Sequence, residues 1–386
     1  MVKLGIDRIN EYDALLRGGR LGVISACSAL SSDYRYPIDI LNEKYNIKTI
    51  FAPEHGPRGV LGPGEKVSGG VDRLTGLTVY SLFEDLLFQK NDGGTFMPDK
   101  TVLADIDCLV YDMQDVGSRY FTYVSTLFYI MKACAENGLP LIVLDRPNPI
   151  GGDVEGCVQD EENLSFIGLT RVPIRHGMTV GELARLYNGE YKIGCDLTVV
   201  PLTGWDHGMY YDETGLPFVR PSPNLPTFES VLVYNGTCMF AGTNVSEGRG
   251  TTQPFLLVGA EFIDPITLAD RLNNSVDGVK FSPAVFRPEF SKSAGKTLYG
   301  VRLHVTDKRA LKPVRLGVTM IRTLQELYPH DFEFTPPKAG GRYHIDLSTG
   351  NSDLRDGVLS ADQIMKKWNK DAKEFEIKRK KYLLYE

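Results

Sequence analysis

The 386-residue chain has no excess of positive charge, with 43 Lys and Arg against 49 Asp and Glu and a formal net charge of −6. Binding to nucleic acid needs a basic face, so this composition argues against such a partner. No run approaches the roughly 18 apolar residues of a membrane span. The first residues, MVKLGIDRINEYDALL, lack the apolar core of a signal peptide. From the sequence we therefore expect a soluble cytoplasmic protein without a membrane span.

Cysteine is scarce, and its six copies form no CxxC pair. Cys108 and Cys134 lie in apolar runs, so we interpret them as reduced core residues. The histidines form no HxH or HExxH pattern. A metal site built from His55, His176 and Asp115 would have to be assembled across the fold, and a polar cleft or core histidines explain these residues better. We expect no cofactor.

The signatures of nucleotide binding and of nucleophilic catalysis are also missing. No GxGxxG follows the first strand, no glycine-rich loop ends in GK[ST], and no GxSxG or clear Cys–His pair is present. The loop SEGRGT (246–251) combines a carboxylate, an arginine and two glycines, which suits an anion. What remains is carboxylate chemistry, in which one acid donates a proton and a second carboxylate is base or nucleophile.

The first 200 residues alternate between strands and helices. Apolar, β-branched runs predict strands at 21–25, 47–51, 77–81, 107–113, 140–144 and 197–202. Helical spacing or caps predict helices at 36–42, 121–136 and 180–188, the last with a Thr179–Glu182 capping box and closed by Gly189. This alternation predicts an α/β fold with a mostly parallel sheet and helices on both faces.

After residue 204 the sequence changes to loops rich in aromatics, proline and glycine, and then to a second region. That region is expected to contain a strand at 298–306 and helices at 266–273, 314–327 and 361–382. At this length, two domains are the natural expectation. The last helix carries charges of both signs, so we expect it to dock on the protein with a solvated outer face.

The stretch FAPEHGPRG (51–59) places ionisable residues where a buried strand ends. Pro53 stops the strand, Glu54 and His55 follow it, and Arg58 lies between two glycines. Carboxylates that end strands and face water are common in α/β folds, so this stretch alone leaves both interpretations open.

Two further strands end in similar residues, and ligands of open parallel sheets bind at the carboxyl ends of strands. The 107–113 strand is followed by Asp115, Arg119 and Tyr120, and the 140–144 strand by Arg146 and Asn148. Three such ends predict a polar cleft. Aromatics at 205–218 and Tyr120 offer faces for sugar rings, and the arginines suit an anionic substituent. The proline-rich loop RPSPNLPT would hold Asn224 as a binding wall, although a purely structural loop explains it almost as well.

The motifs FAPEHGPRG, DMQDVGSRYFTY, LDRPNPIGG, HGMTVGELARLYN, GCDLTVVP, PSPNLPT and GTNVSEGRGTTQPF occur in this order. Together they closely resemble the bacterial exo-β-N-acetylmuramidase family of the NamZ type, from about Leu21 to the end. The resemblance implies a glycoside hydrolase that releases terminal N-acetylmuramic acid (MurNAc) from the non-reducing end of peptidoglycan fragments. It also implies a Rossmann-like domain, which we place at 1–235, a smaller α+β domain at 236–386, and an active site in the cleft between them.

The resemblance assigns the catalytic glutamate of the EHG motif to Glu54, which we interpret as the general acid. Asp115 or Glu247 is the candidate second carboxylate. We expect its carboxyl group to lie at the wide separation from Glu54 that is typical of an inverting enzyme, or Glu54 to have no close carboxylate partner at all. In the second case the substrate's acetamido group is the nucleophile. Four arginines compete for the lactyl carboxylate of MurNAc, namely Arg58, Arg119, Arg146 and Arg249. Further candidate substrate-binding residues are His55, Tyr120, Asn148, His176, Asn224 and Asn244.

Two loops depart from the family pattern, SACSALS (25–31) and YSLFED (80–85), and they bear on aglycone preference and on activity itself. A catalytically silent muropeptide-binding protein is therefore the alternative from another class. A metal-dependent hydrolase is the third hypothesis.

Overall fold

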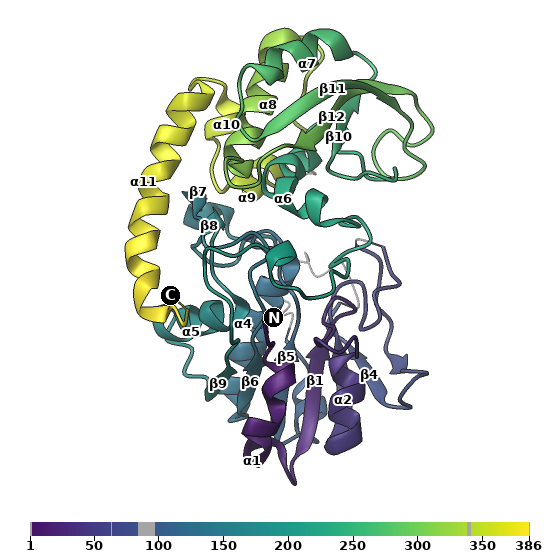
Figure 1. The fold of residues 1–386 in the computed structure, drawn as a ribbon, viewed down its shortest axis with the longest axis vertical. Coiled ribbons are helices and arrows are strands. Elements are labelled where there is room, and N and C mark those ends of the chain that lie inside the picture. The colour runs from purple at the N-terminus through teal and green to yellow at the C-terminus, as the bar shows by residue number, and fades with distance from the viewer. Residues whose placement is uncertain (1, 63, 84–96, 338–340, 386) are drawn as a thin grey trace.

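The computed structural model describes residues 2–62, 64–83, 97–337 and 341–385, and Figure 1 shows a lower α/β region and a smaller upper region. The lower region is built on one seven-stranded sheet with the order β3-β4-β2-β1-β5-β6-β9. Its strands are β1 (Arg20–Ser25), β2 (Asn46–Ala52), β3 (Gly70–Val71), β4 (Thr78–Ser81), β5 (Cys108–Asp112), β6 (Leu141–Leu144) and β9 (Leu197–Val200). All neighbouring strands pair in parallel except β3 with β4, so the predicted mostly parallel α/β sheet is confirmed.

The sheet is buried on both faces, which explains why its central strands are continuous apolar runs. In β5, Leu109 and Tyr111 join the core beneath α4 (Thr122–Asn137) and α5 (Val180–Glu190), whereas Cys108 and Val110 join the core on the other side. That second face is covered by α2 (Pro37–Lys44), α1 (Asp13–Leu16) and the 3₁₀ helix η1 (Ile6–Tyr12). The prediction of reduced cysteines in the core is also confirmed, because Cys108 and Cys134 are buried and unpaired.

Helix α5 begins as predicted and ends later than predicted. Thr179 and Glu182 form the expected capping box. Gly189 does not close the helix, which continues to Glu190 with Tyr191 as its C-cap. A side chain at Gly189 would lie 2.6 Å from the Tyr382 hydroxyl, so this glycine permits a close approach of the C-terminal segment.

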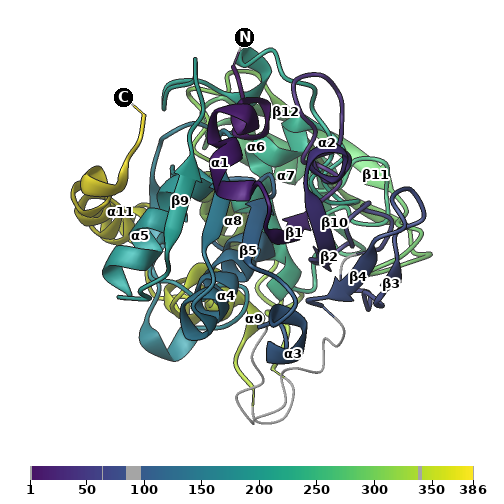
Figure 2. The same cartoon turned by 90° about the horizontal axis from the view of Figure 1, so that it is seen from below.

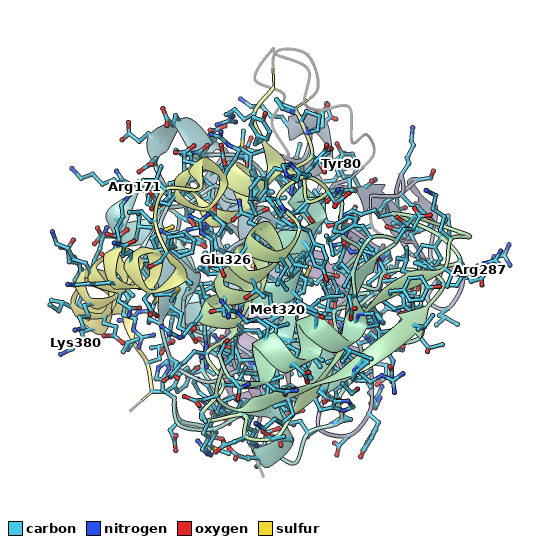
Figure 3. The ribbon with its side chains drawn as sticks, turned by 90° about the horizontal axis from the view of Figure 1, so that it is seen from above. Tyr80, Arg171, Arg287, Met320, Glu326 and Lys380 are labelled. Carbon is cyan, nitrogen blue, oxygen red and sulfur yellow. The ribbon has the colours of Figure 1, made fainter. Side chains whose placement is uncertain are left out.

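The upper region contains an antiparallel sheet of β10 (Leu257–Ala260), β12 (Leu298–Val305) and β11 (Val279–Phe286), in that order. Helices α6 (Phe228–Thr237), α7 (Pro265–Asn273) and α8 (Pro313–Leu327) pack with it. The boundary that we place after residue 235 falls within α6. Seen from above, Met320 of α8 lies among the packed helices, whereas Arg287 and Lys380 project from opposite edges (Figure 3).

Helix α11 (Ala361–Arg379) runs along one side of both regions, and Figure 2 shows it beside α5. It packs on α8 and on β7 (Glu155–Val158), the partner of β8 (Pro173–Arg175). The chain then returns to the parallel sheet, where the Tyr385 hydroxyl donates to Asp145 Oδ2 at 2.5 Å. No helix of the described segments is long and apolar enough to cross a membrane.

The remaining elements are short. They are α3 (Lys100–Leu103), α9 (His344–Thr349), α10 (Asp353–Asp356), and the 3₁₀ helices η3 (Glu161–Asn163), η4 (Tyr211–Glu213), η5 (Cys238–Gly242) and η6 (Lys380–Tyr382).

Candidate active site

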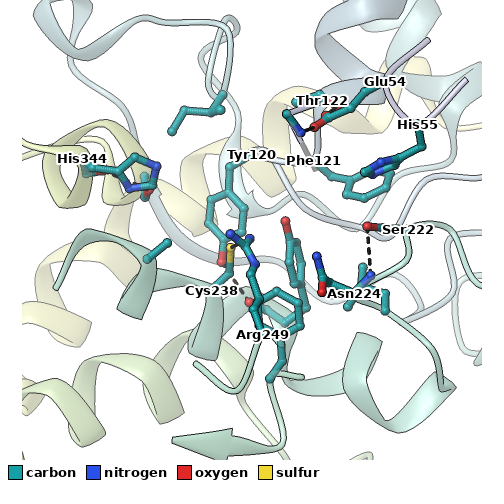
Figure 4. Close-up of a pocket in the computed structure, with 17 residues that line it drawn as sticks. Glu54, His55, Tyr120, Phe121, Thr122, Ser222, Asn224, Cys238, Arg249 and His344 are labelled. Atoms are coloured by element: carbon teal, nitrogen blue, oxygen red, sulfur yellow. Dashed lines mark hydrogen bonds between the residues drawn. The ribbon is translucent and has the colours of Figure 1, made fainter. Parts of the chain in front are cut away.

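A cavity of about 290 Å³ lies where the two regions meet, and Figure 4 shows its lining. The parallel-sheet region contributes the loop after β2 and the start of α4, whereas the upper region contributes α6, the SEGRGT loop and α9. Of the described residues that line this cavity, Glu54 is the only carboxylate and Arg249 the only arginine. The described lining therefore holds one acid and one strong cation within walls of aromatic, aliphatic and polar residues.

Glu54 is positioned by the turn that ends β2 and by the start of α4. Its Oε1 accepts a hydrogen bond from the Gly64 N–H at 3.1 Å, and its Oε2 accepts one from the Thr122 hydroxyl at 2.6 Å. Thr122 is the first residue of α4, so the helix N-terminus also favours a negative charge here. His55 and Gly56 both adopt positive φ (71° and 75°), and the sharp turn that they form carries Glu54 into the cavity.

His55 lies beside Glu54 in the wall but is already engaged with its own loop. The ring is buried, and its Nδ1 is 3.0 Å from the Leu61 carbonyl oxygen. It therefore helps to shape the turn as well as the cavity.

Arg249 enters from the upper region. Its Nε lies 3.4 Å from Glu247 Oε1, and its guanidinium carbon lies 5.2 Å from the centre of the Phe255 ring. Burial alone would lower the pKa of Arg249, but Cys238 and the Glu247 carboxylate raise it above its ordinary value. Arg249 is therefore cationic in the cavity wall.

The rest of the wall combines aromatic, aliphatic and polar residues. The Tyr120 and Tyr234 rings meet edge to face at 5.5 Å, and Tyr234 meets Phe255 at 4.9 Å. The Asn224 side chain is buried, and its Nδ2 has no hydrogen-bond partner within the described structure, so a donor is available to a ligand. Burial lowers the pKa of His344, and the charges of Arg249 and Lys292 lower it further, so His344 is neutral at pH 7.

The structure brings together some of the residues predicted for the site. Glu54, His55, Tyr120, Asn224 and Arg249 all line the cavity. The two candidate second carboxylates do not line it. Asp115 is buried, where its Oδ2 accepts from the Gly117 N–H at 2.7 Å and lies 3.1 Å from His176 Nε2. Glu247 is buried behind Arg249.

The other three candidate arginines are not part of the lining and make structural contacts instead. Arg58 forms ion pairs with Asp39 and Asp72. Arg146 pairs with Asp112 and donates to the Leu30 carbonyl, inside the SACSALS loop, which is not part of the lining either.

Arg119 donates to four backbone carbonyls. They belong to Cys157, Val172, Ser348 and Thr349, so this buried side chain ties the upper region to the lower one.

The remaining predicted polar residues also hold local structure. Asn148 donates to the Met178 carbonyl, and Asn244 donates to the Asp331 carbonyl. Both ring nitrogens of His176 have partners, because Nε2 lies 3.1 Å from Asp115 Oδ2 and Nδ1 accepts a hydrogen bond from the Met178 N–H. The aromatic stretch at 205–218 does not line the cavity, and Trp205 packs on Tyr385 instead. In the YSLFED loop, Glu84 and Asp85 lie outside the described residues.

Several lining residues were not predicted, above all Thr122, Tyr234, Cys238 and His344. Thr122 stands in the motif that was singled out, two residues after Tyr120. The other three come from α6, η5 and α9, whose docking against the sheet cannot be read from the sequence. Within the described ranges, no three His, Cys, Asp or Glu side chains are grouped to hold a metal ion.

Two regions around a cavity of this size, with one carboxylate and several aromatic side chains in its described lining, are typical of an enzyme that works on a small polar ligand through carboxylate chemistry. The chain belongs to the exo-β-N-acetylmuramidase NamZ family, because the family's N-terminal model matches residues 21–229 and its C-terminal model matches residues 232–385. It is therefore a glycosidase.

Curated and solved relatives agree over the whole length. The peptidoglycan β-N-acetylmuramidase NamZ of Bacillus subtilis (strain 168) is 43% identical over 392 residues, which cover 100% of this chain and 91% of that protein. Two crystal structures of DUF1343 family proteins from Bacteroides fragilis NCTC 9343 superpose with TM-scores of 0.88 and 0.80. They are 34% and 31% identical, and each match covers 100% of this chain and 99% of the other.

Proposed function

We propose that the protein releases terminal MurNAc from the non-reducing end of peptidoglycan fragments, with Glu54 as the general acid. The observation that carries this proposal is the composition of the cavity, in which Glu54 and Arg249 are the sole acid and the sole arginine of the described lining. The B. subtilis relative, described as a peptidoglycan β-N-acetylmuramidase, supports the choice of substrate.

The cavity suits one sugar residue rather than a glycan chain. Its volume of about 290 Å³ lies just below the roughly 300–1,000 Å³ of ligand pockets, which supports exo-cleavage. Aromatic walls such as Tyr120 and Phe121 offer faces for the sugar ring, and Asn224 offers an unpaired donor. Arg249 supplies the charge that the lactyl carboxylate needs and that GlcNAc cannot use.

The absence of a second carboxylate from the described lining favours participation of the substrate itself. In this mechanism the acetamido oxygen attacks C1, the glycosidic C1–O bond breaks, and Glu54 gives its proton to the leaving oxygen. Water then opens the resulting oxazolinium at C1 and returns a proton to Glu54. The Thr122 hydroxyl can donate to the carboxylate and accept from the acid, so it holds Glu54 in both protonation states.

Glu54→Gln tests the proposed acid. The amide keeps the shape but cannot protonate the leaving oxygen, so turnover of a MurNAc disaccharide should fall by about a hundredfold or more. An aryl glycoside with a good leaving group should lose less. Glu65→Gln, on the same loop but exposed, is the matched control. An unchanged rate in Glu54→Gln would remove Glu54 from the mechanism.

The same assay separates the alternatives. Binding of a muropeptide without turnover by the wild-type protein would indicate a silent binding protein. Loss of activity in a chelator, restored by a divalent metal, would indicate a metal-dependent hydrolase.

A further inference from the structure

Behind the cavity wall, one buried carboxylate lies between two cations. Glu247 is 2% exposed, with Oε1 3.4 Å from Arg249 Nε and Oε2 3.3 Å from Lys292 Nζ. Arg249 lines the cavity, whereas Lys292 does not. Two cations and one anion leave this cluster with a net charge of +1.

Hydrogen bonds hold the Lys292 side chain in this position. Its ammonium group also donates to the Phe240 carbonyl at 2.6 Å and to the Val245 carbonyl at 2.8 Å. Three acceptors thus satisfy the three donors of one ammonium. Burial lowers the pKa of Lys292, and the Glu247 charge opposes that shift.

The two loops that carry these charges are fixed to each other. Gly250, directly after Arg249, has φ of +84°, and a side chain there would lie 2.2 Å from the Phe290 carbonyl oxygen. The Glu289 N–H donates to the Gly250 carbonyl at 2.8 Å. The loop that holds Lys292 therefore has a fixed position relative to the SEGRGT loop.

The charge balance matters because a carboxylate so close to Arg249 would otherwise cancel its charge. In a partly buried setting, Glu247 alone with Arg249 would form a neutral pair with little attraction for a second anion. With Lys292 on its other oxygen, Glu247 is shared between two cations, and Arg249 keeps charge and donors for a ligand. Its Nη2 has only a weak contact in the described structure, to Cys238 Sγ at 4.0 Å.

We propose that Lys292 is a positioning residue that sets specificity: by neutralising Glu247, it makes Arg249 a receptor for the carboxylate of an acidic amino sugar. The inference rests on the proposed function. Lys292 itself does not touch the sugar, so its loss should weaken binding of the acidic sugar and leave the chemical step nearly intact.

The test compares Lys292→Met with Lys292→Arg, and with Lys296→Met as the matched control. Lys296 lies four residues along the same loop and pairs only with the exposed Glu261 among the described ion pairs. The measurements are kcat and KM on a chromogenic MurNAc glycoside and inhibition by free MurNAc and free GlcNAc. For Lys292→Met we expect a roughly tenfold higher KM and a tenfold weaker inhibition by MurNAc, with kcat and GlcNAc inhibition within about twofold. Lys292→Arg and Lys296→Met should resemble the wild type.

A double variant distinguishes charge from structure. Lys292→Met combined with Glu247→Gln again leaves a net charge of +1, now on Arg249 alone, so discrimination between MurNAc and GlcNAc in the inhibition assay should return. The inference is overturned if Lys292→Met binds both sugars equally less well, if it discriminates as well as the wild type, or if the double variant fails to recover discrimination. If the wild-type protein does not hydrolyse the MurNAc glycoside, the proposed function fails first, which is a separate result.

Discussion

Thr122 is the side chain that fixes the direction of Glu54 in the cavity. Its hydroxyl donates to Oε2 at 2.6 Å while the Gly64 N–H holds Oε1. A general acid must be held close to the oxygen that it protonates, and a small displacement of it is costly for the rate. For Glu54 as the proposed general acid, we infer that Thr122 is a positioning residue whose effect should appear in kcat.

Thr122→Val removes this hydrogen bond and keeps the shape of the side chain. Because hydrogen bonds to charged groups contribute about 1.5–3 kcal/mol, kcat should fall about ten- to a hundredfold while the melting temperature changes little. Thr122→Ser should restore most of the rate. Thr126→Val, one turn further along α4, is the control, since the Thr122 carbonyl is the only partner of its hydroxyl among the described residues. A KM effect with unchanged kcat would contradict the assignment.

At the scale of elements, the sequence predicts what local patterning determines. Strand β5 is apolar because it is buried on both faces, and the cap of α5 is a local motif; both were predicted. Strand β11 was missed because Pro283 interrupts it and several of its side chains are exposed, as on an edge strand.

The polar residues after β5 and β6 could not be sorted from sequence into those that line the cavity and those that tie loops together. Tyr120 lines the cavity, whereas its neighbour Arg119 points into the protein. The side chains of these two adjacent loop residues point in opposite directions. The packing of the upper region against the loop decides which of them faces the cavity. The sequence does predict Glu54 and Arg249, because Glu54 directly follows a strand end and Arg249 lies between two glycines in a loop. His344 was missed because its helix reaches the cavity from almost 300 residues away.

Arg119→Met tests the role of the buried arginine as a tie between the regions. Four buried carbonyls would lose their donor, at about 1–3 kcal/mol for each buried group left unpaired, so the unfolding free energy should fall by at least about 4 kcal/mol. Urea denaturation measures it. Arg171→Met, at an exposed arginine, should change it by less than about 0.5 kcal/mol. Equal stability of both variants would show that Arg119 does not join the regions.

At the scale of the whole molecule, the C-terminal segment connects the two regions a second time. In the segment that follows α11, the Tyr382 and Leu383 carbonyls accept hydrogen bonds from Arg185 of α5. The Tyr385 hydroxyl donates a hydrogen bond to Asp145. Burial raises the pKa of Asp145 to about 7, although the hydrogen bonds from Tyr385 and from the Gly181 N–H lower it. Folding therefore favours the protonated form of this carboxyl group.

The sign of the pH effect follows from that shift. Because the pKa of Asp145 is about 7 in the folded state and about 4 in the unfolded state, the folded state binds the extra proton between these values. The stability contributed by this group is complete below pH 4 and is lost as the pH rises to 7, by on the order of 1.4 kcal/mol per pH unit. Asp145→Asn should lack this loss. Urea denaturation between pH 5 and pH 8 checks it, and identical slopes for the two proteins would refute the assignment.

We propose that the cavity recognises a carboxylate-bearing sugar through Arg249 and that Glu54 takes part in cleaving its glycosidic bond. The most direct measurement is kcat/KM on matched chromogenic MurNAc and GlcNAc glycosides for the wild type, Arg249→Met and the control Arg58→Met, whose arginine lies outside the cavity lining. We predict that the wild type prefers MurNAc, that Arg249→Met loses about ten- to a hundredfold on MurNAc and little on GlcNAc, and that Arg58→Met keeps the preference. Equal losses on both glycosides in Arg249→Met, or a wild type that does not distinguish them, would contradict the account.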